Sequence, residues 1–549
     1  MADSESPMTR RFPTRAGAYL LLFALLLWGL NALYHRLVLS KYILARTDRA
    51  FTECRNEVEV LFLGDSHVQH GLDPLEIPRA FNFSSQAEHY ALNYYKLESI
   101  LAGGRGRLRT VVLPVDLHSF AARTLENHYF RDPWYWWRYV DYLEAARMIG
   151  DPALIGRMAA AFFPFLGSGM DFFHPVDPDK LTPQVRGFVR NLEDFSRKPD
   201  HAEIARNRAH GMLSGTEMMD DRLAAYFGKI LDLAARAGLE VILVRMPVSR
   251  AYYEEARRHF PDVADLYNAV DSMIAPYDNL LSLDYQKCFF GEDSMFWDSD
   301  HLNAAGAEYL TLHLRADLLE HSLAGLPDEA ARAGLQEDIA AIRQRIAALD
   351  RKRAFAREAR RIGERHRAGD REAAALAEAA FGRGNHDGEI LLVMLTAAAE
   401  TRDGLLDPAL AEAVVESPMP DRIAFPGGRI VAVGLTADFW TTDGRTTYLA
   451  VSAPSDRPER PMLWLACDAA GDALPLTAVI DGGGWRFSHT FLEPSRVRVD
   501  LPEVPPGASW LYVVQTDKTW TPPGGRDNRR LGVHILPVEP ETTDSEKLE

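Results

Sequence analysis

The chain has 549 residues, of which 47% are hydrophobic, and its formal net charge at pH 7 is -17. That length exceeds one ordinary hydrophobic core, so we expect two or three folded domains. The negative charge argues against nucleic acid as a partner, because binding a polyanion needs a basic surface. Cys54, Cys288 and Cys467 form no Cys-x-x-Cys pair. The sequence therefore predicts no metal site and no disulfide framework, although a bridge between Cys54 and Cys288 stays open.

An apolar run from Ala16 to Tyr34, interrupted only by Asn31, is the first element of the chain. A helix rises 1.5 Å per residue, so about 19 residues nearly match a hydrocarbon core of about 30 Å. We therefore predict a single-pass transmembrane signal anchor over residues 16–38, followed by a juxtamembrane segment over residues 39–57.

The flanks of this run predict its orientation. Arg10, Arg11 and Arg15 precede it, and the positive-inside tendency places residues 1–15 in the cytoplasm. A cleaved signal peptide is the competing interpretation, but residues 30–35 make a poor cleavage site. Either way the rest of the chain is exported, and the expected location is a bacterial cell membrane with the folded part periplasmic or extracellular.

Residues 58–323 alternate between strand and helix patterns. This alternation predicts an α/β domain with a doubly wound parallel sheet, whose right-handed crossovers bring the loops after successive strands to one edge. The predicted strands are Val58–Leu63, Ala80–Ser84, Thr110–Leu113, Leu239–Val244 and Leu280–Asp284, and the predicted helices are Ala87–Leu101, Arg222–Ala237 and Ala304–Leu323.

The alternation fails between residues 120 and 220, where aromatic residues and prolines accumulate. Residues 134–137 read Trp-Tyr-Trp-Trp, and residues 162–165 read Phe-Phe-Pro-Phe. We interpret this stretch as a helical insertion whose aromatic side chains pack its own core. The alternative is a lid or a platform for an acceptor sugar, because insertions at a ligand-binding edge often carry specificity.

The last 226 residues change composition twice. Residues 324–415 are rich in Ala, Arg, Glu and Leu, which predicts a helical spacer. Residues 416–540 alternate β-rich runs with turn residues, which predicts an antiparallel β-sandwich that either binds carbohydrate or merely caps the spacer. Residues 541–549 form an acidic tail.

Two short stretches contain the candidate catalytic residues. Residues 60–67, Val-Leu-Phe-Leu-Gly-Asp-Ser-His, read as a buried strand that delivers the hydroxyl of Ser66 at its carboxyl end. Far downstream, Asp298 and His301 lie three residues apart, directly before the last predicted helix. A serine hydroxyl needs an imidazole to take its proton, and the imidazole needs a carboxylate to orient it. Ser66, His301 and Asp298 are therefore the predicted catalytic residues.

These motifs resemble a known family. Gly64-Asp65-Ser66 and Asp298-Ser299-Asp300-His301 are similar to the first and last motif blocks of the SGNH, or GDSL-type, hydrolases. The resemblance covers about half the chain and implies a flavodoxin-like sheet that presents serine as nucleophile, with the histidine as base. Membrane-anchored members of similar layout include the alginate O-acetyltransferases and the D-alanyl transfer protein. The resemblance thus implies acyl transfer or ester hydrolysis outside the membrane.

The chain departs from that family in its oxyanion hole, the set of donors that stabilise the negative oxygen of the transition state. No Gly-x-Asn-Asp block follows the third strand. The candidate replacements are the backbone N–H groups of Ser66 and Ser85, together with Gln86 or His118. Asp65 is expected to accept hydrogen bonds within its loop.

Other histidines and acids lie close to the two motifs in the sequence. His67 and His70 flank the nucleophile and are expected to be loop residues rather than the base. Asp300 competes with Asp298 for the role of orienting carboxylate.

The sequence leaves three candidate functions. The leading one is a membrane-anchored serine O-acyltransferase or esterase that adds or removes acetyl groups on a cell-surface or secreted polysaccharide, through an acyl-enzyme on Ser66. A multi-span membrane acyltransferase is the expected source of acyl groups for the transferase version, and no cofactor is expected. The alternatives are a lipid-directed esterase or thioesterase, and a catalytically degenerate scaffold in a polysaccharide modification or export complex.

Overall fold

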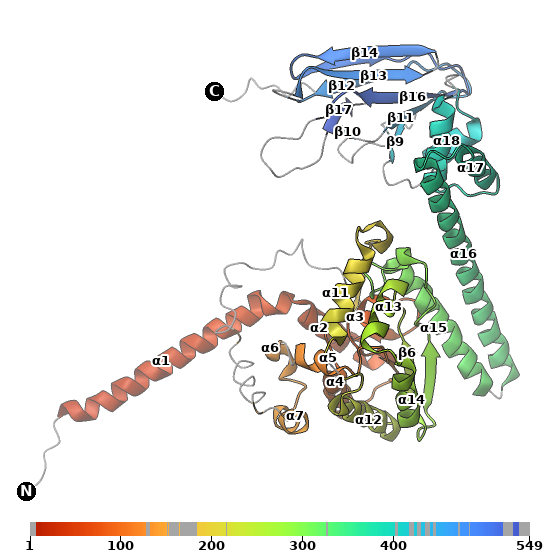
Figure 1. Cartoon of the computed structure of the whole chain (residues 1–549). Helices are drawn as coiled ribbons and strands as arrows, with labels where there is room; N and C mark the ends of the chain where they lie inside the picture. Colours follow the sequence, from red (N-terminus) through yellow and green to blue (C-terminus); the bar gives the residue numbers. More distant parts are fainter. Residues whose placement is uncertain are drawn as a thin grey trace, which may run out of the picture. The chain divides into compact units, whose positions relative to one another are not determined.

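The computed structural model describes residues 7–127, 132–150, 152, 164, 184–215, 217–325, 328–400, 405–416, 422–424, 430–433, 440–442, 446–469, 473–482, 484–519 and 531–536. The chain divides into two compact units, Met1–Ile346 and Ala347–Glu549 (Figure 1). The first unit contains a five-stranded parallel sheet, and the second contains separate antiparallel sheets. The acidic tail lies outside the described residues.

Helix α1 (Pro7–Leu37) opens the first unit, and the stretch Ala16–Lys41 is long and apolar enough to cross a membrane. Figure 1 shows α1 reaching out from the unit. Its last turn nevertheless belongs to the core, because Tyr34 and Val38 are fully buried among the aromatic residues of the α/β fold.

The juxtamembrane residues 39–57 also belong to this core. They form the short turns Leu39–Lys41 and Arg55–Glu57 and helix α2 (Ile43–Cys54) between them. Leu39 and Phe51 are buried, and the Phe51 ring stacks on Phe83 with ring centroids 4.4 Å apart. The folded unit therefore begins before Val58, within the end of α1.

The five predicted strands of the α/β region are all present. They are β1 (Val60–Phe62), β2 (Ala80–Asn82), β3 (Thr110–Pro114), β6 (Glu240–Arg245) and β7 (Leu280–Asp284). All pairs are parallel and the order is β2-β1-β3-β6-β7. In chain order this is 2-1-3-4-5, the order of flavodoxin-like doubly wound sheets, in which ligands bind beyond the strand ends where the order reverses. That place lies between β1 and β3.

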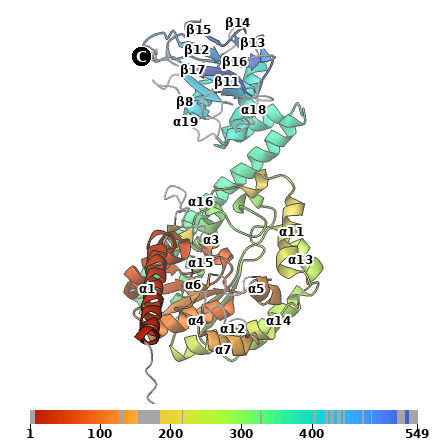
Figure 2. The same ribbon diagram turned by 90° about the vertical axis from the view of Figure 1, so that its left-hand side faces the viewer.

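Helices cover both faces of this sheet, which explains why its strands are continuously apolar. Leu61 and Val111 point into one hydrophobic cluster with α4 and α12, whereas Phe62 and Val112 point into another with α3 and α15. Helices α4 and α12 lie side by side, and α3 packs on α15 (Figure 1 and Figure 2). The covering helices are α3 (Ser66–Gly71), α4 (Tyr90–Ala102), α12 (Asp221–Arg236), α13 (Arg250–His259), α14 (Val263–Ile274) and α15 (Ala304–Gly325).

The aromatic-rich stretch 120–220 is described in part. Trp134, Tyr135 and Trp136 are buried in the core of the first unit, whereas Trp137 is 46% exposed. Most of the second aromatic group, residues 162–165, lies outside the described residues. The described elements are α5 (Ala122–Asn127), α6 (Pro133–Trp136), α7 (Tyr142–Ile149), β4 (Gln184–Val185), β5 (Phe188–Val189) and α11 (His201–Leu213).

Helix α16 (Glu329–Arg367) runs from the first unit into the second. It is followed by α17 (Ala373–Gly382), α18 (Gly388–Glu400) and α19 (Pro408–Glu416). Leu391 of α18 and Val414 of α19 pack against strand residues such as Val431 and Tyr448. These helices of the predicted spacer therefore share a core with the β-rich part.

Two antiparallel sheets form the β-rich part. Residues from both, such as Leu449 and Leu465, build one buried core between them, as expected of a sandwich. The orders are β10-β17-β12-β15 and β14-β13-β16-β11-β9-β8. The strands are β8 (Arg422–Ala424), β9 (Ile430–Val433), β10 (Trp440–Thr442), β11 (Thr447–Ser452), β12 (Met462–Cys467), β13 (Leu476–Gly482), β14 (Trp485–Phe491), β15 (Ser495–Asp500), β16 (Ser509–Thr516) and β17 (Leu531–Leu536). The three cysteines of the chain are free thiols.

Candidate active site

The turn after β1 presents the predicted nucleophile. Gly64 has φ +142°, and a Cβ atom there would come within 2.7 Å of the side chains of Pro114 and Val68, so only glycine fits. Asp65 then caps α3, because its Oδ1 accepts a hydrogen bond of 2.9 Å from the backbone N–H of His67. Ser66 is the first residue of α3 and is half-buried. The turn therefore places its hydroxyl at the carboxyl edge of the sheet.

The structure brings Ser66, His301 and Asp298 together. His301 Nε2 lies 2.8 Å from Ser66 Oγ, and His301 Nδ1 lies 2.9 Å from Asp298 Oδ2. A carboxylate can only accept, so Nδ1 carries the proton and Nε2 is free to accept the Ser66 proton. Asp298 also accepts the backbone N–H of His301 at 2.9 Å, which holds the two side chains in register. This is the geometry that a serine nucleophile needs for activation.

Neighbouring rings restrict the motion of the His301 imidazole. Trp297 stacks on it with ring centroids 5.2 Å apart and an angle of 27° between the ring planes. His67 meets it edge-on at 4.9 Å. The imidazole is 4% exposed, so the base lies in a site from which most water is excluded.

Asp300 has different partners from Asp298. Both of its oxygens accept hydrogen bonds from Arg208, from Nε at 2.9 Å and from Nη2 at 2.8 Å. Its Oδ2 also accepts from His67 Nε2 at 3.2 Å, and its Oδ1 lies 3.8 Å from His301 Nδ1. Asp298 is thus the carboxylate that orients His301 in this structure, and Asp300 joins Arg208 to His67.

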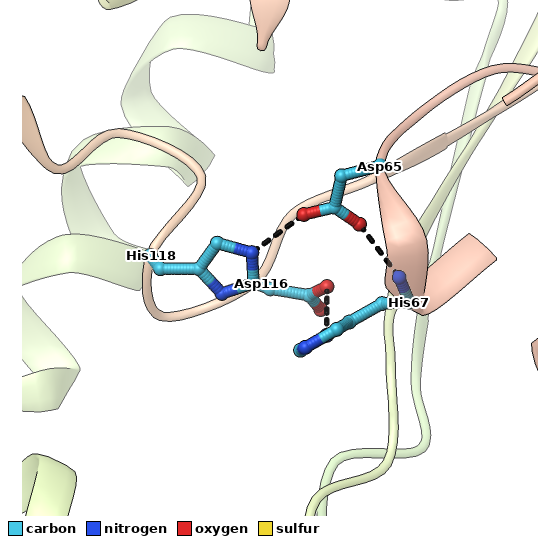
Figure 3. A group of neighbouring side chains, drawn as sticks. All are labelled: Asp65, His67, Asp116 and His118. Atoms are coloured by element: carbon cyan, nitrogen blue, oxygen red, sulfur yellow. Dashed lines mark hydrogen bonds and ion pairs between the residues drawn. The ribbon is translucent and has the colours of Figure 1, made fainter. Parts of the chain in front are cut away.

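Behind the nucleophile lies a buried ion-pair network of Asp65, His67, Asp116 and His118 (Figure 3). His67 Nδ1 lies 3.0 Å from Asp116 Oδ2, and His118 Nε2 lies 2.6 Å from Asp65 Oδ2. The second oxygen of Asp116 accepts the backbone N–H of Met246 at 2.7 Å. The network therefore ties the turns after β1, β3 and β6 to one another.

Charges in this network stabilise each other. Burial alone lowers the pKa of an imidazole, but the carboxylates of Asp65, Asp116 and Asp300 raise the pKa of His67 well above its ordinary value. Burial would raise the pKa of Asp65, yet His118 and His67 hold the pKa of that carboxyl below its usual range. Both ring nitrogens of His67 face carboxylate oxygens, which only accept hydrogen bonds, so this arrangement fits an imidazolium that donates to Asp116 and Asp300.

His70, the second histidine flanking the nucleophile, is electrically neutral at physiological pH. Burial, and to a smaller extent the neighbouring His301, lower the pKa of His70 to about 4. Its Nδ1 donates to the carbonyl oxygen of Val189 at 2.9 Å. His70 therefore ties α3 to β5 and is not the base of the serine.

The same cluster contains the residue types that bind zinc, and one donor atom from each of Asp65, His67, Asp116 and His118 lies within 4.8 Å of the others. The donor atoms are already paired with one another, His67 with Asp116 and His118 with Asp65. We therefore interpret the cluster as an ion-pair network that holds its geometry by its own contacts.

Two of the predicted oxyanion donors are engaged elsewhere. The backbone N–H of Ser85 donates to the carbonyl oxygen of Gly64 at 3.3 Å, and its hydroxyl donates to Glu88 at 2.6 Å. His118 is held by Asp65, and the side chain of Gln86 is exposed. Ser85 and His118 are therefore committed to other hydrogen bonds, whereas the backbone N–H of Ser66 and the side chain of Gln86 stay candidate donors.

Two residues at the site were not found by sequence reasoning. Arg208 lies on α11, inside the segment interpreted as an insertion, and an isolated arginine on a surface helix has no signature. Asn82, at the end of β2, donates from Nδ2 to the carbonyl oxygens of Val68 at 2.8 Å and Leu72 at 2.9 Å. It thereby fixes the helix that begins with Ser66, and a polar residue inside the predicted strand Ala80–Ser84 was the available signal.

Comparisons with known proteins add little to this geometry. No family model matches the chain, and no curated protein matches it. One similar solved structure is described as "The structure of a putative platelet activating factor from Streptococcus pneumonia". It is 14% identical, covers 52% of this chain and 99% of its own, and has a TM-score of 0.27. A likeness this low supports no conclusion on function.

Proposed function

We propose that the protein is a serine acyltransferase or ester hydrolase of the SGNH type. One observation carries the proposal, namely that Ser66 Oγ lies 2.8 Å from an imidazole nitrogen whose partner nitrogen is held by Asp298. The sheet order and the position of Ser66 after the first strand agree with the fold that the family resemblance implies.

In the proposed reaction, Ser66 Oγ attacks the carbonyl carbon of an ester while His301 Nε2 takes the hydroxyl proton. The bond to the leaving alcohol breaks, and His301 returns the proton to that alcohol. An acyl group is now esterified to Ser66. A water molecule or an acceptor hydroxyl then gives its proton to His301 and attacks the acyl carbon. The ester bond to Ser66 breaks, and His301 returns the proton to Ser66 Oγ, which releases the free acid or the acylated acceptor. Asp298 stabilises the imidazolium that forms in both steps.

We propose a polysaccharide outside the membrane as the substrate. The apolar stretch Ala16–Lys41 supports the membrane anchor. In the second unit, Trp485 and Phe487 of β14 are half-buried with nearly parallel rings, 16° apart, which offers aromatic surface of the kind on which sugars stack. An acyl donor delivered by a multi-span membrane partner belongs to the same proposal.

A catalytically degenerate scaffold is the second candidate. The observation in its favour is that Ser85 and His118 are both bonded elsewhere and are not directed at an oxyanion. Without at least two donors, the developing charge of the transition state is poorly stabilised.

The deciding experiment measures covalent labelling. Purified protein is treated with a serine-directed phosphonate, and its intact mass and its turnover of p-nitrophenyl acetate are recorded. We expect one adduct on Ser66 in the wild type and none in Ser66→Ala, with turnover lost in the variant. Ser322→Ala, which changes an exposed serine of α15, is the matched control. Equal labelling of all three proteins, or none in the wild type, would favour the scaffold.

A further inference from the structure

A cavity of about 250 Å³ lies where the end of α1 meets α2 and α6. Nothing in the proposed reaction uses it. Charged, polar and aromatic side chains provide most of its lining, and they are His35, Ser40, Asp48, Arg49, Trp134 and Arg138.

The position of the cavity along the chain sets its depth in a membrane. Counted from Ala16, the twentieth residue is His35, and about 20 helical residues cover the roughly 30 Å of a hydrocarbon core. His35 and Ser40 therefore come at and just beyond the point where α1 leaves the hydrocarbon. Because Tyr34 and Val38 are buried in the α/β core, the cavity is held at the level of the lipid headgroups.

Its charge is unbalanced by one positive unit. Arg138 Nη1 lies 2.6 Å from Asp48 Oδ2, so these two charges compensate each other. Arg49 is exposed at the cavity, and among the residues that the structure describes it has no carboxylate partner. A guanidinium group matches the paired oxygens of a phosphate, and tryptophan favours the membrane interface, where Trp134 lies.

We propose that this cavity binds the phosphodiester headgroup of an anionic phospholipid. The single negative charge of a phosphodiester matches the single excess positive charge beside Arg49. Bound lipid would then fix the orientation of the α/β unit on the membrane, since the cavity walls belong to both the membrane helix and the folded core. The proposal depends on α1 crossing a membrane and is independent of the chemistry at Ser66.

Native mass spectrometry of the full chain, released from detergent micelles, tests this site. The protein is offered phosphatidylglycerol and phosphatidylcholine in equal amounts. We expect the wild type to retain one phosphatidylglycerol in preference to phosphatidylcholine, and Arg49→Gln to retain at least tenfold less. Arg36→Gln is the charge-matched control, because Arg36 is exposed near the same end of α1 but does not line the cavity. This control should retain the lipid as the wild type does.

The site is overturned by three results. The first is an equal loss of bound phosphatidylglycerol in Arg36→Gln and Arg49→Gln, which would mean general attraction to an anionic surface. The second is unchanged retention of phosphatidylglycerol in Arg49→Gln. The third is equal retention of phosphatidylglycerol and phosphatidylcholine by the wild type. Arg49→Gln removes no ion pair among the described residues, so its thermal unfolding in lipid-free detergent should match the wild type. A variant that unfolds earlier is replaced by Arg49→Lys, which keeps the charge and should retain an intermediate amount of lipid if paired guanidinium contacts matter.

Discussion

At the scale of single residues, two aspartates separated by one residue have separate tasks. Asp298 contacts both the ring and the backbone of His301, whereas Asp300 is enclosed by Arg208 and His67. Burial would raise the pKa of Asp300, but His301 and Arg208 lower it well below its usual range. Asp298 therefore orients the base, and Asp300 compensates the positive charges of Arg208 and His67.

This division predicts opposite effects for two matched variants. Asp298→Asn should lower kcat for p-nitrophenyl acetate by about 10³- to 10⁴-fold, because the imidazole loses the carboxylate that fixes its tautomer. Asp300→Asn should lower kcat far less but reduce the free energy of unfolding by about 3 kcal/mol, since Arg208 loses its carboxylate partner and His67 loses one of its two. Steady-state kinetics and thermal unfolding of both variants distinguish the roles. A larger kinetic effect in Asp300→Asn would reverse the assignment.

The raised pKa of His67 predicts how stability depends on pH. Below about pH 6.5 the unfolded chain also binds the proton, so the stabilising contribution of His67 is fully present. Above that pH the unfolded chain releases the proton while the folded protein keeps it. The contribution of His67 to the free energy of unfolding should therefore fall by about 1.4 kcal/mol for each unit of pH above that value.

Thermal unfolding at pH 6.5, 7.5 and 8.5 measures this slope. The melting temperature of the wild type should fall across the series, and that of His67→Gln should start lower and fall less. Parallel slopes in the two proteins would mean that His67 does not hold an extra proton in the folded state.

At the scale of elements, helix α4 is joined to the loop after β2 by a buried ion pair. Lys96 of α4 pairs with Glu88, and its Nζ also donates to the carbonyl oxygen of Phe83 at 2.7 Å. Both charged side chains are almost completely buried. Burial lowers the pKa of Lys96 and, against the attraction of Lys96, raises the pKa of Glu88 to about 7. Glu88 also accepts from Ser85, so this pair supports the loop beside the nucleophile.

Removing one member of the pair should cost more than removing both. Lys96→Met leaves an uncompensated buried carboxylate and should destabilise the protein by about 3–5 kcal/mol. The double variant Lys96→Met/Glu88→Gln should recover much of that loss, because the amide keeps the contact with Ser85 and carries no charge. Melting temperatures of the single and double variants form the test. Additive losses would show that the two charges do not interact.

At the scale of the whole molecule, helix α1 and the folded core are continuous. Tyr34 of α1, and Val38 and Leu39 directly after it, are at most 3% exposed and belong to the same cluster as the strands of the parallel sheet. The end of α1 is therefore part of the first unit and cannot be removed without opening the core.

Soluble fragments should show this continuity. A fragment that begins at Thr47 lacks Tyr34, Val38 and Leu39, whereas one that begins at Asn31 keeps all three. Each of these side chains contributes about 1.5–3 kcal/mol when fully buried, so the shorter fragment should melt at a clearly lower temperature. Equal melting temperatures would place the start of the folded unit at or after Thr47, within α2.

The sequence by itself determined the local elements and the identity of the candidate triad. The five strands of the parallel sheet appear where period and turn residues indicated them, because buried parallel strands read as continuous apolar runs. Gly64, Ser66 and His301 were visible because their chemistry is carried by motifs of adjacent residues.

The tertiary structure alone decided which groups meet across the fold. It assigned Asp298 to His301, brought Arg208 to Asp300 from a segment without a motif, and placed Ser85 in hydrogen bonds that differ from the expected role. It also showed that the end of α1 belongs to the core. Asp298 and Asp300 both lie within three residues of His301, so only geometry separates their roles. Arg208 and Asp300 are 92 residues apart, and spacing along the sequence holds no information on which distant donor reaches which acceptor.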